Sequence, residues 1–386
     1  MDRIYLDNAA TSWPKPDAVY QAMEHFQRTV GAPAGRGTYR EVIDVLRMVE
    51  QTRNQVAKFI HAPDRRNIAF TYSGTDSLCT AILGILGDGD HVVTSTVDHN
   101  SVLRPLRHLE NQNRISVTRV ACDGTGLLDA DDLIGAIQSH TRLLVMPHVG
   151  NVTGTIQPIE AVGPHCRKSG VTFLVDAAQS LGHLPIDVSS IGCDLLAAPG
   201  HKGLLGPLGT GILFYTDEVA KLMHPLRFGG TGSIGSLDEQ PAQWPEKFEA
   251  GNLNVAGIAG LGAGINFIES DAGRERLETV ESLKILLANG LEKIDGISLY
   301  GPRDVGDRTG VFSFTFDGMD SNEAASVLDA TWSIQSRAGI HCAPLLHRTI
   351  GTEPMGGTVR LSLGLFNTNH QIEITLNALA EVASQN

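Results

Sequence analysis

The feature that most limits the possible folds of this chain is a series of seven short apolar runs that begins after Asn67. In order they are IAFTY, HVVTST, ISVTRVA, LLVMPH, VTFLVD, DLLAA and GILFY. Helix-length segments separate most of them, and strands that alternate with helices form a largely parallel sheet between helical layers. The runs are apolar throughout, as in strands covered on both faces. We therefore predict an α/β domain with a mostly parallel seven-stranded sheet, whose ligand site lies at the carboxyl ends of the strands.

Helical patterns precede and follow this series. Apolar residues recur at intervals of three and four over Asp17–Thr29 and Tyr39–Phe59, and again in a Gly- and Ala-rich stretch after Asn254 and in an amphipathic one over about Arg274–Leu291. The rest of the chain mixes strand-like runs with helical patterns: ISLYG, VFSFTF, a helix near Ser321–Asp329, WSIQSR, TVRLSL and a last helix over Asn369–Ala383. We predict a large domain over residues 15–262 and a smaller α+β domain from residues 1–14 and 263–386.

Composition excludes several classes of protein. The 30 Lys and Arg against 43 Asp and Glu give a net charge of −13, which argues against nucleic acid or an anionic membrane as a general partner. The N-terminus lacks a secretory pattern, and no apolar run reaches the roughly 18 residues of a membrane span, so we expect a cytoplasmic protein. The five cysteines contain no CxxC pair, so we expect neither a disulfide framework nor a metal site.

One lysine follows an apolar run directly. The turn PGHKG places Lys202 after the strand-like segment Asp194–Ala198. A lysine that is buried or flanked by cations loses its proton readily and can form a Schiff base with a carbonyl cofactor such as pyridoxal phosphate (PLP). The alternative is an exposed loop lysine, which is the commoner case for this residue type. The residues expected near Lys202 in the fold distinguish a Schiff-base lysine from an exposed one.

Other polar residues also follow predicted strand ends. Ser73-Gly74-Thr75-Asp76 opens a helix after IAFTY and offers backbone N–H groups to a phosphate. Asp98-His99 follows HVVTST, Gly150-Asn151 follows LLVMPH, and VTFLV ends in Asp176, with Gln179 three residues later. Each motif alone is weak evidence for a site.

The spacing of Asp176 and Lys202 is more informative. Their separation of 26 positions allows a short helix and one further strand, which would bring both to one edge of the sheet. A carboxylate there can pair with a protonated pyridine nitrogen while the lysine holds the aldehyde. The alternative for Asp176 is a helix N-cap, with Gln179 completing a capping box.

Nine motifs then identify a family. They are, in order, YLDNAATS, SGTDS, DHNS, GNVTGT, VDAAQS, GHKGLLGPLGTG, FEAGNLN, RAGIHCAP and VRLSLGLFNT. Together they resemble the cysteine desulfurase and selenocysteine lyase family, which are PLP-dependent proteins of class V aminotransferase fold, and most of all its members with a short RxGxHCA loop. The resemblance extends from Tyr5 to Thr368. It implies fold type I of the PLP-dependent transferases.

The resemblance assigns most of the PLP site. It implies that Lys202 binds PLP covalently, Asp176 pairs with the pyridine nitrogen and Gln179 contacts the phenolic oxygen. His99 would stack on the ring and assist proton transfer, and Asn151 would support cofactor and substrate. The phosphate would be held by these residues: Gly74, Thr75, His201 and, from a partner subunit, Asn252.

The resemblance also assigns the substrate side of the site. Arg360 corresponds to the arginine that binds the substrate carboxylate, and a bidentate guanidinium suits that task. The alternative for Arg360 is a surface arginine on a small-domain strand. Cys342 corresponds to the cysteine that attacks the substrate sulfur or selenium, and the alternative for it is a small residue that fits its turn. His341 and Arg337 would promote the thiolate if they point inward.

Three residues depart from the family pattern. Pro199 stands where Ser or Thr is common, and it offers the phosphate neither a hydroxyl nor an N–H. Asn252 replaces a frequent Thr, although an amide still donates a hydrogen bond. Both changes bear on how tightly PLP is held. Ile340 replaces a histidine of the better-known sulfur-mobilising members, which bears on substrate and partner.

The predicted activity is conversion of L-cysteine to L-alanine with transfer of sulfur to Cys342 as a persulfide. The resemblance implies a homodimer and a sulfur-acceptor protein. Alternatives are a selenocysteine lyase, and an aminotransferase or β-eliminating lyase that does not need Cys342, because one fold hosts many reactions. A further alternative is a non-catalytic relative in sulfur trafficking, which only Pro199 and Asn252 support.

Overall fold

The predicted central sheet is present and contains all seven apolar runs. In this computed structural model, which describes residues 3–35, 37–231 and 238–384, the sheet has the strand order β2-β8-β7-β6-β5-β3-β4. Among these strands, β8 alone runs opposite to the other six, so the sheet is mostly parallel, as predicted. The strands are β2 (Ile68–Thr71), β3 (Asp90–Ser95), β4 (Ile115–Val120), β5 (Thr141–Pro147), β6 (Thr172–Asp176), β7 (Leu195–Pro199) and β8 (Gly211–Tyr215).

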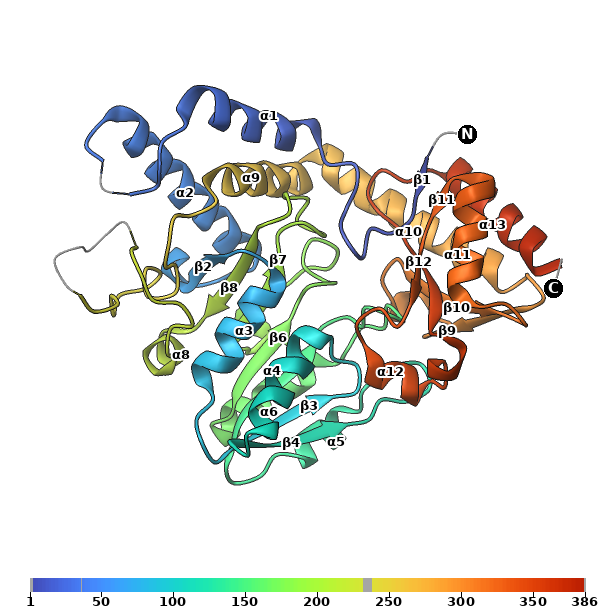
Figure 1. Ribbon diagram of the computed structural model, residues 1–386, viewed down its shortest axis with the longest axis horizontal. Helices are drawn as coiled ribbons and strands as arrows, with labels where there is room; N and C mark the ends of the chain where they lie inside the picture. Colours follow the sequence, from blue (N-terminus) through green and yellow to red (C-terminus); the bar gives the residue numbers. More distant parts are fainter. Residues whose placement is uncertain (1–2, 36, 232–237, 385–386) are drawn as a thin grey trace.

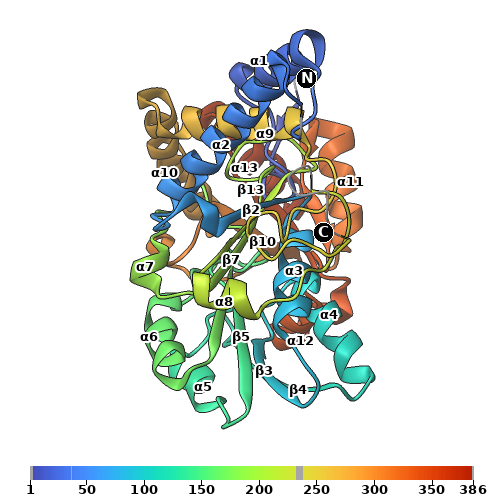
Figure 2. The same cartoon turned by 90° about the vertical axis from the view of Figure 1, so that its left-hand side faces the viewer.

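Helices cover both faces of this sheet (Figure 2). Along β5 successive side chains alternate between two cores, because neighbouring residues of a strand point to opposite faces. Leu143 and Val145 pack in the core that includes α3 (Gly74–Ile85) and α4 (Asn100–Asn111). Leu144 packs in the other, with α6 (Ile159–Ser169). This double burial explains why the strand sequences are apolar on both faces. The other helices of this region are α5 (Ala130–Gly135), α7 (Val188–Ile191) and α8 (Asp217–Leu222).

Three further helices pack together beside the sheet (Figure 1). These are α1 (Asp17–His25), α2 (Arg40–Phe59) and the Gly-rich α9 (Val255–Glu269). A Cβ on Gly260 would come within 2.9 Å of the Met23 side chain, so the glycine lets α1 approach α9 closely. The predicted first helix ends earlier as an α-helix than its pattern indicated, because its last turn is a π-helix over Phe26–Val30.

The chain from residue 271 onward forms a smaller antiparallel sheet and its helices, with the strand order β12-β13-β10-β9. Its elements, drawn in orange and red in Figure 1, are β9 (Ile297–Tyr300), β10 (Val311–Phe316), β12 (Arg337–Gly339), β13 (Thr358–Ser362), α10 (Asp271–Leu291), α11 (Ser321–Trp332), α12 (Pro344–Thr349) and α13 (Asn369–Ser384). Short 3-10 turns occupy Arg65–Asn67, Val305–Asp307 and Glu353–Met355.

The N-terminal segment joins this smaller part of the molecule. Strand β1 (Ile4–Tyr5) pairs in parallel with β11 (Ile334–Gln335), and the amide of Ser362 donates to the carbonyl of Leu6 at 2.7 Å. The predicted boundary after residue 262 falls inside α9, and the division into two domains stays a prediction. Within the described residues, no helix is both long and apolar enough to cross a membrane.

Candidate active site

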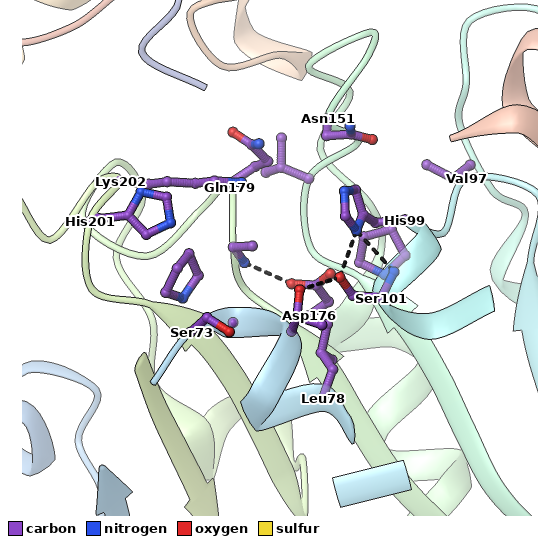
Figure 3. Close-up of a pocket in the computed structure, with 16 residues that line it drawn as sticks. Ser73, Leu78, Val97, His99, Ser101, Asn151, Asp176, Gln179, His201 and Lys202 are labelled. Atoms are coloured by element: carbon purple, nitrogen blue, oxygen red, sulfur yellow. Dashed lines mark hydrogen bonds between the residues drawn. The ribbon is translucent and has the colours of Figure 1, made fainter. Parts of the chain in front are cut away.

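One pocket collects most of the predicted site residues. It lies past the carboxyl ends of β2, β3, β5, β6 and β7, and it contains about 590 Å³ of empty space, open solvent included (Figure 3). Since these strands run in the same direction, the loops that follow them meet at one edge of the sheet. Eight predicted residues line the pocket: Gly74, Thr75, His99, Asn151, Asp176, Gln179, His201 and Lys202.

Lys202 is partly buried at the end of the turn after β7. Burial lowers the pKa of its ammonium group to about 8, and the charges of Arg360 and Arg337 act in the same direction. The N-terminal segment fixes the backbone of the turn, because the carbonyl of His201 accepts from the Ser12 amide at 3.1 Å and from Lys15 Nζ at 2.7 Å. Lys202 thus stands on a fixed backbone and has an amine that deprotonates readily, as a Schiff-base lysine requires.

This pKa leads to a prediction about PLP attachment. Only the neutral amine attacks an aldehyde, and for Lys202 the neutral fraction rises as the pH passes about 8 rather than the ordinary 10.5. We expect the rate of PLP attachment to cofactor-free protein to rise with pH and to level off above about 8, which rapid-mixing absorbance can follow. A rate that still rises steeply toward pH 10 would contradict the assignment.

Asp176 lies buried on the floor of the pocket. Its carboxylate accepts from the Ala178 amide at 2.9 Å, two residues later, and residues 178–180 form a turn. The capping-box alternative is therefore wrong. Burial raises the pKa of Asp176, and the charge of Lys202 lowers it. The short helix α7 and strand β7 fill the interval to Lys202, as its length predicted. Gln179 donates from Nε2 to the Ala9 carbonyl at 3.0 Å, which fixes its side chain.

His99 lies at the start of α4, across the pocket from Lys202 (Figure 3). The backbone amide of Ser101 donates to His99 Nδ1 at 3.0 Å, so the ring proton of the neutral histidine belongs on Nε2. Burial lowers the pKa of His99 to about 4, with the charge of Lys202 as the next cause. The Ser101 and Thr75 hydroxyls lie 2.7 Å apart and connect the starts of α4 and α3. His99 is therefore a neutral, fixed ring at neutral pH.

The start of α3 has the properties of an anion site. The 12-residue helix begins with the Ser73 hydroxyl accepting from the Asp76 amide, and the first-turn N–H groups at Gly74 and Thr75 lie at the positive end of its dipole. Asp76 is paired with Arg227, which offsets its negative charge. Nδ1 of His201 is buried without a partner in the described residues. A phosphate fits these groups.

Pro199 contacts this same end of α3. A Cβ on Gly74 would come within 2.9 Å of Pro199 Cδ, so the proline ring packs directly on the glycine. The site thus lacks a hydroxyl at position 199, and the groups it offers to an anion are those of the helix start and His201.

Arg360 is buried on β13, so the surface alternative is wrong. Its Nη2 donates to Asp7 at 2.9 Å and its Nη1 to the Asn151 carbonyl at 3.0 Å. Nε is buried without a partner in the described part of the chain. Asp7 balances the charge of this guanidinium, a role that the YLDNAATS motif gave no reason to assign.

Cys342 lies beside the pocket rather than among its lining residues. It is half-buried in the turn between β12 and α12, and its carbonyl accepts from the Asn100 amide at 2.8 Å. His341 and Cys342 both have left-handed backbones, with φ of 48° and 61°, a conformation that costs an L-residue about 1–2 kcal/mol. Arg337, on β12, is also only partly buried.

The ring of His341 is buried, with Nε2 3.0 Å from the Thr358 carbonyl on β13. Burial holds the pKa of His341 well below its ordinary value, so this ring is neutral and supplies no charge to the thiol.

Asn252 is exposed outside the pocket, and its carbonyl accepts from the Tyr72 hydroxyl at 3.0 Å.

Asp98 precedes His99 and has a structural role that the sequence did not indicate. It is buried and accepts from Thr94 Oγ1, Ser95 Oγ and the Ser95 amide at 2.7–2.8 Å, which fixes the turn that carries His99. Burial raises its pKa to about 7.

The fold and the pocket define an α/β protein with a partly buried lysine and a helix start suited to an anion at one edge of its sheet. A family model described as aminotransferase class-V matches residues 4–375, and the chain belongs to this family. Members of the family are in general PLP-dependent enzymes, and this chain is an enzyme of that class.

Curated relatives and solved structures agree with that placement. The chain is 36% identical to a probable cysteine desulfurase of Methanothermobacter thermautotrophicus, over 99% of this chain and 95% of the relative. It is 32% identical to a cysteine desulfurase of Yersinia pseudotuberculosis, over 98% and 93%. The apo structure of cysteine desulfurase from Thermococcus onnurineus superposes with a TM-score of 0.93 at 33% identity, covering 100% of this chain and 95% of that one.

Proposed function

We propose that this enzyme removes sulfur from L-cysteine, giving L-alanine and a persulfide on Cys342. The observation that carries the proposal is the arrangement around one pocket of Lys202, Asp176 and His99, with the Cys342 turn and Arg360 beside it. The names of the similar proteins support the same reaction.

The residues of the pocket fit PLP. Lys202 Nζ would hold its aldehyde, Asp176 its pyridine nitrogen, and Gln179 its phenolic oxygen. The start of α3 and His201 would hold its phosphate, and the His99 ring would cover one face. Bound PLP supplies an electron-withdrawing ring that stabilises negative charge at the substrate Cα.

The remaining residues act on the substrate. Arg360 Nε and its free N–H positions bind the α-carboxylate while Asp7 and Asn151 hold the guanidinium in place. Lys202 Nζ removes the Cα proton, which its lowered pKa favours near neutral pH. Cys342 Sγ attacks the substrate sulfur as a thiolate, and the carbon–sulfur bond breaks with its electron pair moving to Cβ. The three-carbon remainder takes up one proton at Cβ and one at Cα and leaves as L-alanine. The persulfide then passes to an acceptor thiol, either of a small molecule or of an acceptor protein in the cytoplasm.

We also propose that the enzyme is a homodimer. Tyr39, directly before α2, and Ile43 and Leu46 within it are exposed large apolar residues at intervals of four and three, which is typical of a helix face that binds another surface. Asn252 lies too far outside its own pocket to line it, so a role at the phosphate requires a neighbouring subunit.

The test is release of alanine from L-cysteine, L-selenocysteine and L-cysteine sulfinate, each with and without a reductant, by protein loaded with PLP. We expect L-cysteine to be turned over, and a thiol reductant to increase the rate because it removes the persulfide. Turnover of L-selenocysteine alone would replace the proposal with a selenocysteine lyase. Absence of alanine from all three substrates would contradict both functions.

A further inference from the structure

The backbone of the Cys342 turn is strained and yet firmly held. Two successive residues other than glycine, His341 and Cys342, have left-handed backbones. Such conformations persist only where surrounding contacts impose them, and they concentrate at functional sites. The contacts that impose this one therefore determine where the thiol stands.

The shortest hydrogen bond to this turn comes from the pocket itself. Asn151 Nδ2 donates to the carbonyl of His341 at 2.6 Å, and both groups are buried. The acceptor is a carbonyl, so the orientation of the Asn151 amide is fixed: its nitrogen faces the cysteine turn. Its Oδ1 has no partner in the described residues. Figure 3 shows Asn151 at the upper edge of the pocket.

Asn151 is itself on a rigid support. It lies at the tip of the turn after β5, which a bridge between Val149 and Ile156 closes. The next two residues are tied to the smaller sheet region, because Ser313 Oγ donates to the Val152 carbonyl at 2.6 Å and Arg308 Nη2 to the Thr153 carbonyl at 3.1 Å. The position of Asn151 is therefore fixed independently of the Cys342 turn, and its amide can restrain that turn.

The same residue touches the arginine of the substrate side. The Asn151 carbonyl accepts from Arg360 Nη1 at 3.0 Å. We infer that Asn151 is a positioning residue for the nucleophile: its side-chain amide holds the His341 carbonyl and so fixes Cys342 relative to Arg360. This inference rests on the proposed function, in which Cys342 takes the substrate sulfur. It gives Asn151 a second task beside the support of cofactor and substrate.

The test compares Asn151→Asp and Asn151→Ala with the unaltered protein, and with Asn377→Asp, which makes the same charge change at an exposed site on α13. Without cofactor, hydrogen exchange is measured at two amides that report on the turn: Asn100, which donates to Cys342, and Ala343, which donates to Ile340. We expect exchange at both to accelerate by about tenfold or more in the Asn151 variants, with the amides of β5 unchanged.

Kinetics of the loaded protein provide the second measurement. Misplacing a reacting group by about 1 Å costs roughly 100-fold in rate, so kcat for alanine release should fall by about that factor while KM changes less than about threefold. A large rise in KM with unchanged kcat would indicate that Asn151 only binds substrate, and would overturn the inference.

Unchanged exchange at Asn100 and Ala343 in Asn151→Ala, which buries no new charge, would also overturn it, even if Asn151→Asp fails to fold. The exchange measurement needs neither cofactor nor substrate. A wrong inference about Asn151 is therefore distinguishable from a wrong proposed function, which alanine release by the unaltered protein tests.

Discussion

Replacement of Cys342 by alanine is expected to abolish production of sulfide and persulfide from L-cysteine, with a loss of on the order of 10³-fold or more. The reason is that no other described thiol has its position: Cys122, Cys166 and Cys193 are buried, and Cys79 lies on α3 with a pKa that burial raises. The pocket itself contains no part of Cys342, so the absorbance band of loaded PLP should stay unchanged.

The matched control for this experiment is Cys79→Ala, which removes the other half-buried thiol and should retain activity. Full activity of Cys342→Ala would contradict the desulfurase function and favour a PLP reaction that needs no thiol. Loss of activity toward L-cysteine with retained activity toward L-selenocysteine would separate the two substrates.

Replacement of Lys202 by alanine is expected to remove covalent attachment of PLP and to lower the rate of alanine release by on the order of 10³-fold or more, since both the anchor and the base are lost. Borohydride reduction followed by peptide mass analysis should place the PLP adduct of the unaltered protein on Lys202 and find none in the variant. Lys202→Arg should fail equally, because a guanidinium keeps the charge but does not form the linkage.

Lys168→Ala is the control, because that lysine is exposed at the end of α6. An adduct that persists on another lysine of the Lys202→Ala variant would contradict the assignment. Lys15 is the residue to examine first in that event, because burial lowers the pKa of Lys15 to about 8 as well.

The strands and most of the pocket were predictable because they depend on local pattern. A strand covered on both faces is apolar on both, as are Leu143–Met146 in β5 and Phe173–Val175 in β6. Parallel strands of one sheet end at the same edge. The interval between Asp176 and Lys202 has room for one helix and one strand, so both residues were expected at that edge.

What the sequence by itself determined is therefore the sheet, the order of its strand-end motifs and, through nine motifs, the family. Only the tertiary structure decided which groups neutralise and position the site. Asp7 pairs with Arg360 353 residues away, and Asn151 holds the His341 carbonyl 190 residues away. Such contacts follow from how the N-terminal segment and the smaller sheet pack on the large one, and no local period or spacing encodes them. The neutral state of His341 was equally inaccessible, because it depends on burial against Thr358 rather than on the adjacent cysteine.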